Sequence, residues 1–299
     1  MTLKQLEAFY WAATCSSFAM AAERVHLSVS SLSKRIAELE ASLGQALFDR
    51  GRHRAALTEA GERLLPLAAA LLQQADRLHQ EMGSATGLRG PCRLGVGELT
   101  ALTWLPRLVA AIAGAHPDLQ VSVHVDVGAA LAERLDKGEL DVAVIAGPAS
   151  RSALTAVPLA HASFSWCASP QIAHSVPRMD AAAMRAQPLV TLPQGSGVTQ
   201  LIDDWLRLAG AQAERRLACN HWGAIVGLLA HGAGIGLLPK GWAHALCARG
   251  VLQNLPSPVA LGQLPYALHS RRDDLRPLVG ALQGLAAQHA DFTVASSIF

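Results

Sequence analysis

Two short amphipathic helices joined by a tight turn constrain this chain more than any other feature. They lie within residues 17–47, SFAMAAERVHLSVSSLSKRIAELEASLGQAL. Ser17 is a suitable N-cap, and apolar residues follow it at helical spacing. A polar break at residues 26–28 ends the first helix, and Ser28 can cap a second one. Two helices in this order, close to the start of the chain, are typical of a helix-turn-helix unit that binds DNA.

The second helix has two chemically different faces. Leu32, Ile36, Leu39 and Leu43 recur at steps of four, three and four residues, so we expect them to face the protein interior. The outward face carries small hydroxyls and cations, which suit the major groove of DNA. The candidate DNA-contacting residues of this helix and its cap are Ser28, Val29, Ser30, Ser33, Lys34 and Arg35.

From Leu3 to Gly61 the sequence resembles the LysR-type transcriptional regulators. The resemblance implies an N-terminal all-α winged helix-turn-helix plus a linker helix, followed by an α/β two-subdomain effector-binding domain that is periplasmic-binding-protein-like. The family's common Gln-Pro pair after the cap serine is replaced here by Val29 and Ser30, so an amide that could read an adenine edge is missing. The operator sequence is therefore left open. The matching positions are Ser17, Phe18, Ala21, Ala22, Glu23, Ser28, Leu32, Ser33, Ile36, Leu39, Glu40, Leu43, Gly44, Leu47, Phe48, Arg50, Leu57, Thr58, Ala60 and Gly61.

A basic run follows the helix pair, and we predict that residues 50–56 form the wing. The formal net charge of the chain is only +2, so the distribution of cations matters more than their total. Arg50, Arg52 and Arg54 are the candidate phosphate contacts of this run. A solvated surface loop is the alternative interpretation of the same residues.

Residues 59–90 are predicted to form a linker helix and a hinge, between a DNA-binding domain at 1–58 and an effector-binding domain at 91–299. The helix has an apolar stripe and no domain of its own to cover it, so we expect it to pair with a second subunit. The family resemblance further implies that the protein assembles as a homotetramer. Pro66 should bend the helix, and a Gly-rich stretch follows it.

From Cys92 onward, predicted strands alternate with predicted helices, which indicates a parallel α/β arrangement. The segments HPDLQVSV, KGELDVAV and HGAGIGLLPKGWA resemble the family's effector-binding domain. The resemblance implies two subdomains joined by crossing strands near 163–168 and 266–270. Subdomain I would take about 91–163 and 266–299, and subdomain II about 164–265. The expected early elements are a strand at 92–97, a helix at 102–115, a strand at 119–127, a helix at 129–137 and a strand at 140–145.

Several helix N-termini should converge on the crevice between these subdomains, where backbone N–H groups favour an anionic guest. We therefore expect a small carboxylate as effector, and Trp222 favours an aromatic one. Glu98 would repel a carboxylate unless it is paired. By resemblance, the candidate effector-binding residues are Leu99, Thr100, Gly128, Gly147, Gly195, Ser196, Gly197, Val198, His221, Trp222 and Tyr266.

No motif indicates an enzyme, a metal site or a cofactor. The glycine-rich GAGIG at 232–236 follows a helix and precedes a strand, the reverse of the order in a dinucleotide-binding loop. There is no G-x-S-x-G nucleophile turn. The five cysteines form no C-x-x-C pair, so we expect reduced, buried thiols.

We therefore predict a regulator that binds double-stranded promoter DNA, responds to a small effector and acts on RNA polymerase. No apolar run of about 18 residues suggests a membrane span, and no secretory signal is evident, so we expect a cytoplasmic protein. An effector-independent or redox-responsive regulator of the same family is the alternative. A periplasmic solute-binding protein would share the bilobal fold, but it would need an export signal in place of residues 1–60.

Overall fold

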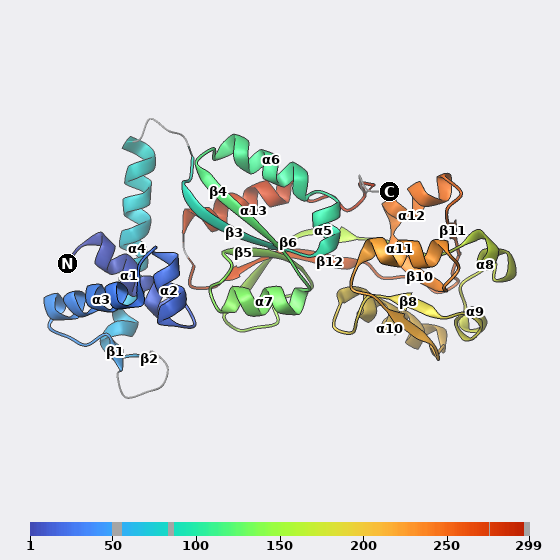
Figure 1. Ribbon diagram of the computed structural model, residues 1–299, viewed down its shortest axis with the longest axis horizontal. Helices are drawn as coiled ribbons and strands as arrows, with labels where there is room; N and C mark the ends of the chain where they lie inside the picture. Colours follow the sequence, from blue (N-terminus) through green and yellow to red (C-terminus); the bar gives the residue numbers. More distant parts are fainter. Residues whose placement is uncertain (50–55, 83–86, 275, 296–299) are drawn as a thin grey trace.

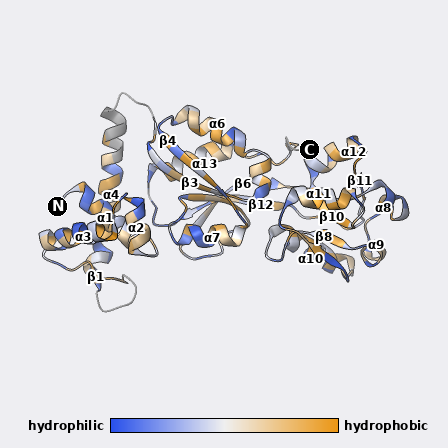
Figure 2. Ribbon diagram, in the orientation of Figure 1, coloured by the Kyte–Doolittle hydropathy of each residue, from blue (hydrophilic) through white to orange (hydrophobic). Residues whose placement is uncertain are grey.

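The computed structural model describes residues 1–49, 56–82, 87–274 and 276–295. Figure 1 shows a helical N-terminal unit beside a first α/β lobe, with a second α/β lobe beyond it. Apolar residues, orange in Figure 2, occur on the helices and strands of both lobes. The predicted order of a helical unit, a linker helix and two subdomains is confirmed.

The N-terminal unit is built from three helices whose caps are local in sequence: α1 (Leu3–Thr14), α2 (Phe18–Arg24) and α3 (Val29–Leu43). Thr2 and Gln5 form a reciprocal capping box at the start of α1. Ser17 accepts a hydrogen bond from the backbone N–H of Met20, and Ser28 accepts one from Ser31. The two caps predicted for the helix pair are therefore confirmed.

The inward face of α3 agrees with the predicted periodicity except at its end. Leu32, Ile36 and Leu39 are buried, but Leu43 is 39 % exposed. The prediction for Leu43 was wrong because it is the last residue of α3, where Gly44 adopts a left-handed conformation and the chain turns away from the core. Antiparallel strands β1 (Phe48–Asp49) and β2 (Ala56–Leu57) then flank the predicted wing. Arg50, Arg52 and Arg54 lie outside the described residues.

The linker helix α4 (Glu59–Met82) is 24 residues long and contains Pro66. One side of it packs on the N-terminal unit, where Ala68 and Ala69 are buried. Three leucines on another side, Leu67, Leu71 and Leu78, are 60 %, 46 % and 62 % exposed. Nothing in the described part of the chain covers this leucine stripe.

The first lobe, subdomain I, has a five-stranded sheet in the order β4-β3-β5-β12-β6. Its strands are β3 (Gly90–Val96), β4 (Leu119–Val125), β5 (Val142–Ala146), β6 (Leu154–Ala162) and β12 (Leu264–Arg271), and its helices are α5 (Glu98–Leu102), α6 (Leu105–Ala115), α7 (Gly128–Asp136) and α13 (Pro277–His289). The prediction of one helix over 102–115 was wrong. Thr103 leaves the helical conformation, and Pro106, in the first turn of α6, cannot donate a backbone hydrogen bond.

The second lobe, subdomain II, has a sheet in the order β11-β7-β10-β8-β9. Its strands are β7 (Phe164–Ala168), β8 (Leu189–Thr191), β9 (Arg216–Ala218), β10 (Ile235–Pro239) and β11 (Gln253–Asn254), and its helices are α8 (Pro170–Ser175), α9 (Ala181–Ala186), α10 (Gly197–Ala209), α11 (Trp222–Ala230) and α12 (Lys240–Ala248). The GAGIG segment forms the turn after α11 and the first two residues of β10, so it follows a helix and enters a strand as predicted.

Two segments connect the lobes. The outgoing chain crosses at Ser163, between β6 and β7, and the return crosses within residues 255–263, before β12. Of the outgoing crossing predicted at 163–168, only Ser163 lies between the sheets, because 164–168 form β7 of subdomain II. The predicted return at 266–270 was wrong, because those residues already belong to the sheet of subdomain I. Tyr266, for example, pairs with Ala146 on one side and Ala160 on the other. A strand with neighbours on both sides cannot also serve as the connection.

Candidate DNA-binding face and effector cleft

The N-terminal half of α3 presents the predicted DNA-contacting side chains to solvent. Val29, Ser30, Ser33 and Lys34 are exposed, and Arg35 is half-buried. Val29 is 46 % exposed, so its apolar side chain is accessible to a partner. The Ser28 hydroxyl lies 2.9 Å from the Ser30 hydroxyl and 2.8 Å from that of Ser31, so the hydroxyls at the start of α3 are ordered by one another.

Most of the predicted effector residues lie at helix N-termini of both subdomains, at α5 and α7 of subdomain I and at α10 and α11 of subdomain II. A carboxylate already occupies one of these ends. Both oxygens of Glu98, the first residue of α5, lie 3.1 Å from the backbone N of Trp222, and Oε1 lies 3.5 Å from Nε2 of His221. Glu98 thus connects subdomain I to the N-terminus of α11. This pairing resolves the expected repulsion and leaves less positive potential at α11 for an external anion.

In the part of the chain that the structure describes, no carboxylate bonds to the N-terminus of α10. Ser196 caps this helix, accepting a 3.1 Å hydrogen bond from the backbone N–H of Thr199. Gly195 has φ 85°, a conformation that glycine adopts easily. Gly197 lies so close to Leu264 that a Cβ would be 2.7 Å from its Cδ1. The Ser196 cap takes the amide of Thr199, whereas the amides of Gly197 and Val198 have no acceptor within the helix and can bind an anion.

Several predicted effector residues have buried side chains: Leu99, Thr100, Val198, Trp222 and Tyr266. The ring of Trp222 stacks on Phe164, with centroids 6.3 Å apart, and meets Trp242 edge-on at 5.7 Å. The indole is therefore part of the core of subdomain II, and only the backbone of Trp222 faces Glu98. The Thr100 hydroxyl is buried without a hydrogen-bond partner in the described part of the chain.

The remaining predicted effector residues are half-buried or exposed: Gly128, Gly147, Gly195, Ser196, Gly197 and His221. Gly128 begins α7 at an uncapped N-terminus, and Gly147, at the end of β5, has φ 88° and accepts a 3.2 Å hydrogen bond from Nε2 of His269. These residues come from α7, α10 and α11 and from the end of β5. Glu98 was noted in the sequence as an obstacle to an anion, but its partner in α11 could not be identified there.

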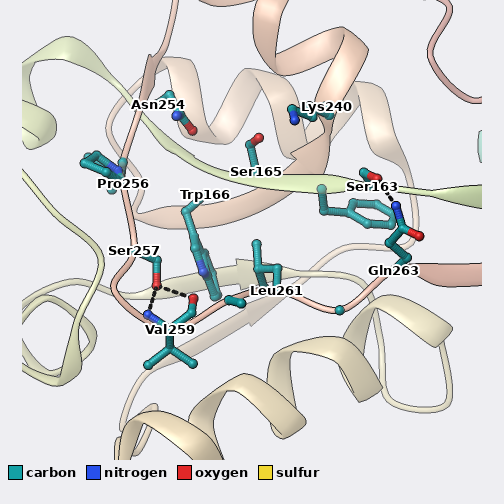
Figure 3. A pocket seen from close by; sticks show the side chains of 14 residues that line it. Ser163, Ser165, Trp166, Lys240, Asn254, Pro256, Ser257, Val259, Leu261 and Gln263 are labelled. Carbon is teal, nitrogen blue, oxygen red and sulfur yellow. Dashed lines mark hydrogen bonds between the residues drawn. The ribbon is translucent and has the colours of Figure 1, made fainter.

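A separate pocket of about 320 Å³ lies where the two connecting segments enter subdomain II (Figure 3). Ser163 and Gln263, one from each segment, are joined across it by a 3.0 Å hydrogen bond. Lys240 and Asn254 also line it, as Figure 3 shows. The pocket includes none of the predicted effector residues, and no sequence motif indicated it.

The cysteines are less uniformly buried than predicted. Cys92 and Cys167 are buried, but Cys15, Cys219 and Cys247 are partly exposed because they lie at the ends or outer faces of their elements. Burial raises the pKa of the Cys92 thiol to about 12 and raises the pKa of Cys167 and Cys247 as well. A raised pKa keeps a thiol protonated and slow to react.

Within the described residues, no three His, Cys, Asp or Glu side chains are grouped as a metal site would require. None of the described helices has the length and apolarity needed to cross a bilayer.

Two family models match the chain. The Bacterial regulatory helix-turn-helix protein, lysR family, matches residues 3–62, and the LysR substrate binding domain matches residues 85–291. A "Probable hydrogen peroxide-inducible genes activator" of Mycobacterium avium is 32 % identical over 301 residues, covering 96 % of each protein.

Solved structures give the same fold. An H2O2-bound cysteine-to-serine mutant of Corynebacterium glutamicum OxyR has a TM-score of 0.58 at 26 % identity, covering 96 % of this chain and 94 % of that one. Full-length CbnR in complex with its target DNA has a TM-score of 0.53 at 20 % identity, covering 96 % and 99 %. The second match supports the fold alone.

Proposed function

This chain belongs to the LysR family of DNA-binding transcriptional regulators, and we propose that α3 reads its operator while an anionic effector binds at the N-terminus of α10. The observation that carries the proposal is the outward face of α3, which is exposed on a helix pair matching the family's DNA-binding model. Its relatives are regulators of transcription rather than enzymes.

The proposed DNA contacts divide into two classes. Val29, Ser30, Ser33 and Lys34 face the base edges, where the Val29 side chain can contact a thymine methyl group. Arg35 and the region of the Ser28 cap lie beside them. Arg50, Arg52 and Arg54 of the predicted wing contact phosphates, which makes the affinity fall with salt.

Lys34→Ala should weaken binding to the operator by roughly tenfold, because a lost contact to a base edge typically costs about 1–3 kcal/mol. The assay is a gel shift of the full chain on the intergenic DNA beside its own gene, at two salt concentrations and with specific competitor. The control is Lys240→Ala, which removes the same charge from subdomain II. Equal affinity of Lys34→Ala and the parent at both salt concentrations would count against the α3 face.

The effector proposal rests on the contrast between two helix ends. Glu98 occupies the N-terminus of α11, whereas at α10 the Ser196 hydroxyl accepts only the amide of Thr199 and leaves the amides of Gly197 and Val198 for an anion. A small carboxylate bound there would gain both hydrogen bonds and the favourable helix dipole. The buried Thr100 hydroxyl, which lacks a partner, offers a further donor if the cleft opens.

Ser196→Asp should weaken the binding of such a carboxylate by more than about tenfold, because it places a negative charge at the proposed anion position. A panel of small carboxylic acids is first screened by thermal shift on the full chain, and each hit is measured by calorimetry. Ser152→Asp, in an exposed loop of subdomain I, is the control. Unchanged affinity in the Ser196 variant would refute binding at α10.

We also propose that α4 pairs with its counterpart in a second subunit. The exposed leucine stripe of Leu67, Leu71 and Leu78 supports this, since helices with such stripes commonly associate. Pairing brings two α3 helices to a palindromic operator. Assembly into a tetramer in the cytoplasm and an action on RNA polymerase complete the proposal.

A redox-responsive regulator of the same family is the second candidate. The similarity to a probable hydrogen peroxide-inducible genes activator and to an H2O2-bound OxyR mutant favours it. Against it, burial raises the pKa of Cys92 and Cys167, so little thiolate is available to react. Thiol titration before and after exposure to peroxide distinguishes the candidates, since an unchanged count of free thiols excludes the second one.

A further inference from the structure

The N-terminal unit is connected to subdomain I by more than α4, because residues at the ends of α1 and α2 also bond to that subdomain, which lies beside the unit in Figure 1. One hydrogen bond between backbone groups and one from a side chain to a backbone carbonyl join the two domains. The N–H of Ser16 donates to the carbonyl of Lys137 at 3.2 Å, and Arg271 donates from Nη1 to the carbonyl of Thr14 at 2.8 Å. The two domains therefore meet through hydrogen bonds between defined groups.

A buried ion pair lies at the centre of this interface. Arg24, the last residue of α2, is 2.5 Å from Oδ1 of Asp141, and the two side chains are only 3 % and 0 % exposed. Nε of Arg24 also donates to the carbonyl of Gly138 at 2.8 Å. Because removing charges from water is costly, two domains that merely touched would keep such groups hydrated.

Side chains from both domains also pack closely against the backbone of Gly138. Gly138 has φ 76°, and a Cβ there would lie 2.6 Å from Nη1 of Arg271 and 3.1 Å from Sγ of Cys15. Three segments, from α1, the end of α7 and β12, therefore meet at one glycine. A larger residue would separate them.

Trp11 of α1 completes the interface. The guanidinium carbon of Arg24 lies 4.9 Å from the centre of its ring, and that of Arg276, from subdomain I, lies 4.7 Å from it. Cations at this distance from an indole are attracted to it, most strongly where water is excluded. One aromatic side chain of the DNA-binding unit thus contacts arginines of both domains.

Asp141 is held in place independently of Arg24. Its Oδ2 accepts a 2.7 Å hydrogen bond from the backbone N–H of Arg93, and its Oδ1 lies 2.6 Å from Nη2 of Arg276. The acceptor is therefore already positioned on subdomain I before α2 docks. Arg24 can be changed while Asp141 keeps two partners.

We propose that Arg24 and Asp141 form an interdomain latch that holds the helix-turn-helix unit on subdomain I in one orientation. The DNA-reading residues Ser30, Ser33 and Lys34 stay exposed, so the latch orients α3 and does not cover it. A shift in subdomain I then moves α3 through packed contacts, in addition to any change in the linker. The proposal goes beyond the proposed function, since it requires neither a particular operator nor a particular effector.

Hydrogen–deuterium exchange of the full chain tests the latch with Arg24→Met, which keeps the length of the side chain and removes its charge. Peptides containing Ser16 and residues 137–141 should exchange at least about tenfold faster than in the parent, because a buried ion pair has lost one partner. Peptides of α3 over 32–39 should stay protected. Arg151→Met, which removes the exposed pair with Asp136, should change neither region.

Unchanged exchange at Ser16 and at 137–141 in Arg24→Met would overturn the proposal. If α3 also loses protection, Arg24→Lys decides, since it keeps the charge but cannot reproduce the guanidinium fork. The latch predicts that acceleration in Arg24→Lys is concentrated at Ser16 and 137–141. Acceleration spread evenly through α1 to α3 would mean that Arg24 stabilises only its own unit, and would overturn the latch.

Discussion

Replacement of Asp141 by alanine should lower the free energy of unfolding by about 3–5 kcal/mol, the usual effect of removing one partner of a buried ion pair. The Asp141 carboxylate is buried between Arg24 and Arg276 and accepts the backbone N–H of Arg93. Alanine would leave Arg24 in the interface with only the carbonyl of Gly138 as acceptor. Asp141 bonds to arginines of both domains, so its removal should destabilise both of them.

Urea unfolding at neutral pH, followed by tryptophan fluorescence and extrapolated linearly, measures this loss. Asp136→Ala is the matched control, because Asp136 pairs with Arg151 at the surface and such pairs contribute about 0–1 kcal/mol. A loss in Asp141→Ala no larger than in the control would contradict the account of this site.

The difference in unfolding free energy between the parent and Asp141→Ala should depend on pH, and its sign follows from the pKa of Asp141. Burial alone would raise the pKa of Asp141, but Arg276, Arg24 and the backbone N–H of Arg93 outweigh it and hold the pKa below its usual value. A depressed native pKa contributes stability above the unfolded-state pKa of about 3.9 and loses it as pH falls through the native value. The difference between parent and Asp141→Ala should therefore shrink in acid.

Alanine at Gly61 should destabilise the winged unit by about 1–3 kcal/mol or more, although alanine is the better helix former. Gly61 lies in the first turn of α4, where a Cβ would overlap the carbonyl oxygen of Leu47 and lie 2.9 Å from Cδ2 of Leu57. Leu47 precedes β1 and Leu57 ends β2, so the clash is against segments that flank the predicted wing. The carbonyl oxygen of Leu47 belongs to the backbone, so it cannot move aside as the end of a flexible side chain could.

Gly114→Ala in α6 should have the opposite effect on stability. No atom lies within 4 Å of a Cβ at that position, so the intrinsic preference for alanine should stabilise the chain by up to about 1 kcal/mol. Thermal unfolding and the gel shift are measured for both variants. A stabilising Gly61→Ala, or a gel shift as strong as that of the parent, would show that α4 does not pack against Leu47 as described.

The start of the chain was the most predictable part because its signals act over a few residues. Ser17 and Ser28 each bond to an amide three positions later, and Leu32, Ile36 and Leu39 are brought to one face by helical geometry alone. The misplaced elements have a different cause. Thr103 interrupts a run that is apolar on both sides, and the position of the return crossing depends on the pairing of β12 with β5 and β6.

The sequence by itself determined the helix pair, its caps, the order of strands and helices, and the family to which these patterns belong. Tertiary structure alone decided which charges meet. Glu98 reaches the backbone of Trp222, 124 residues away, and Arg24 reaches Asp141, 117 residues away. Helix and strand periodicity report only whether a residue faces inward or outward. The partner of a buried charge depends on how separate elements pack, which no local pattern encodes.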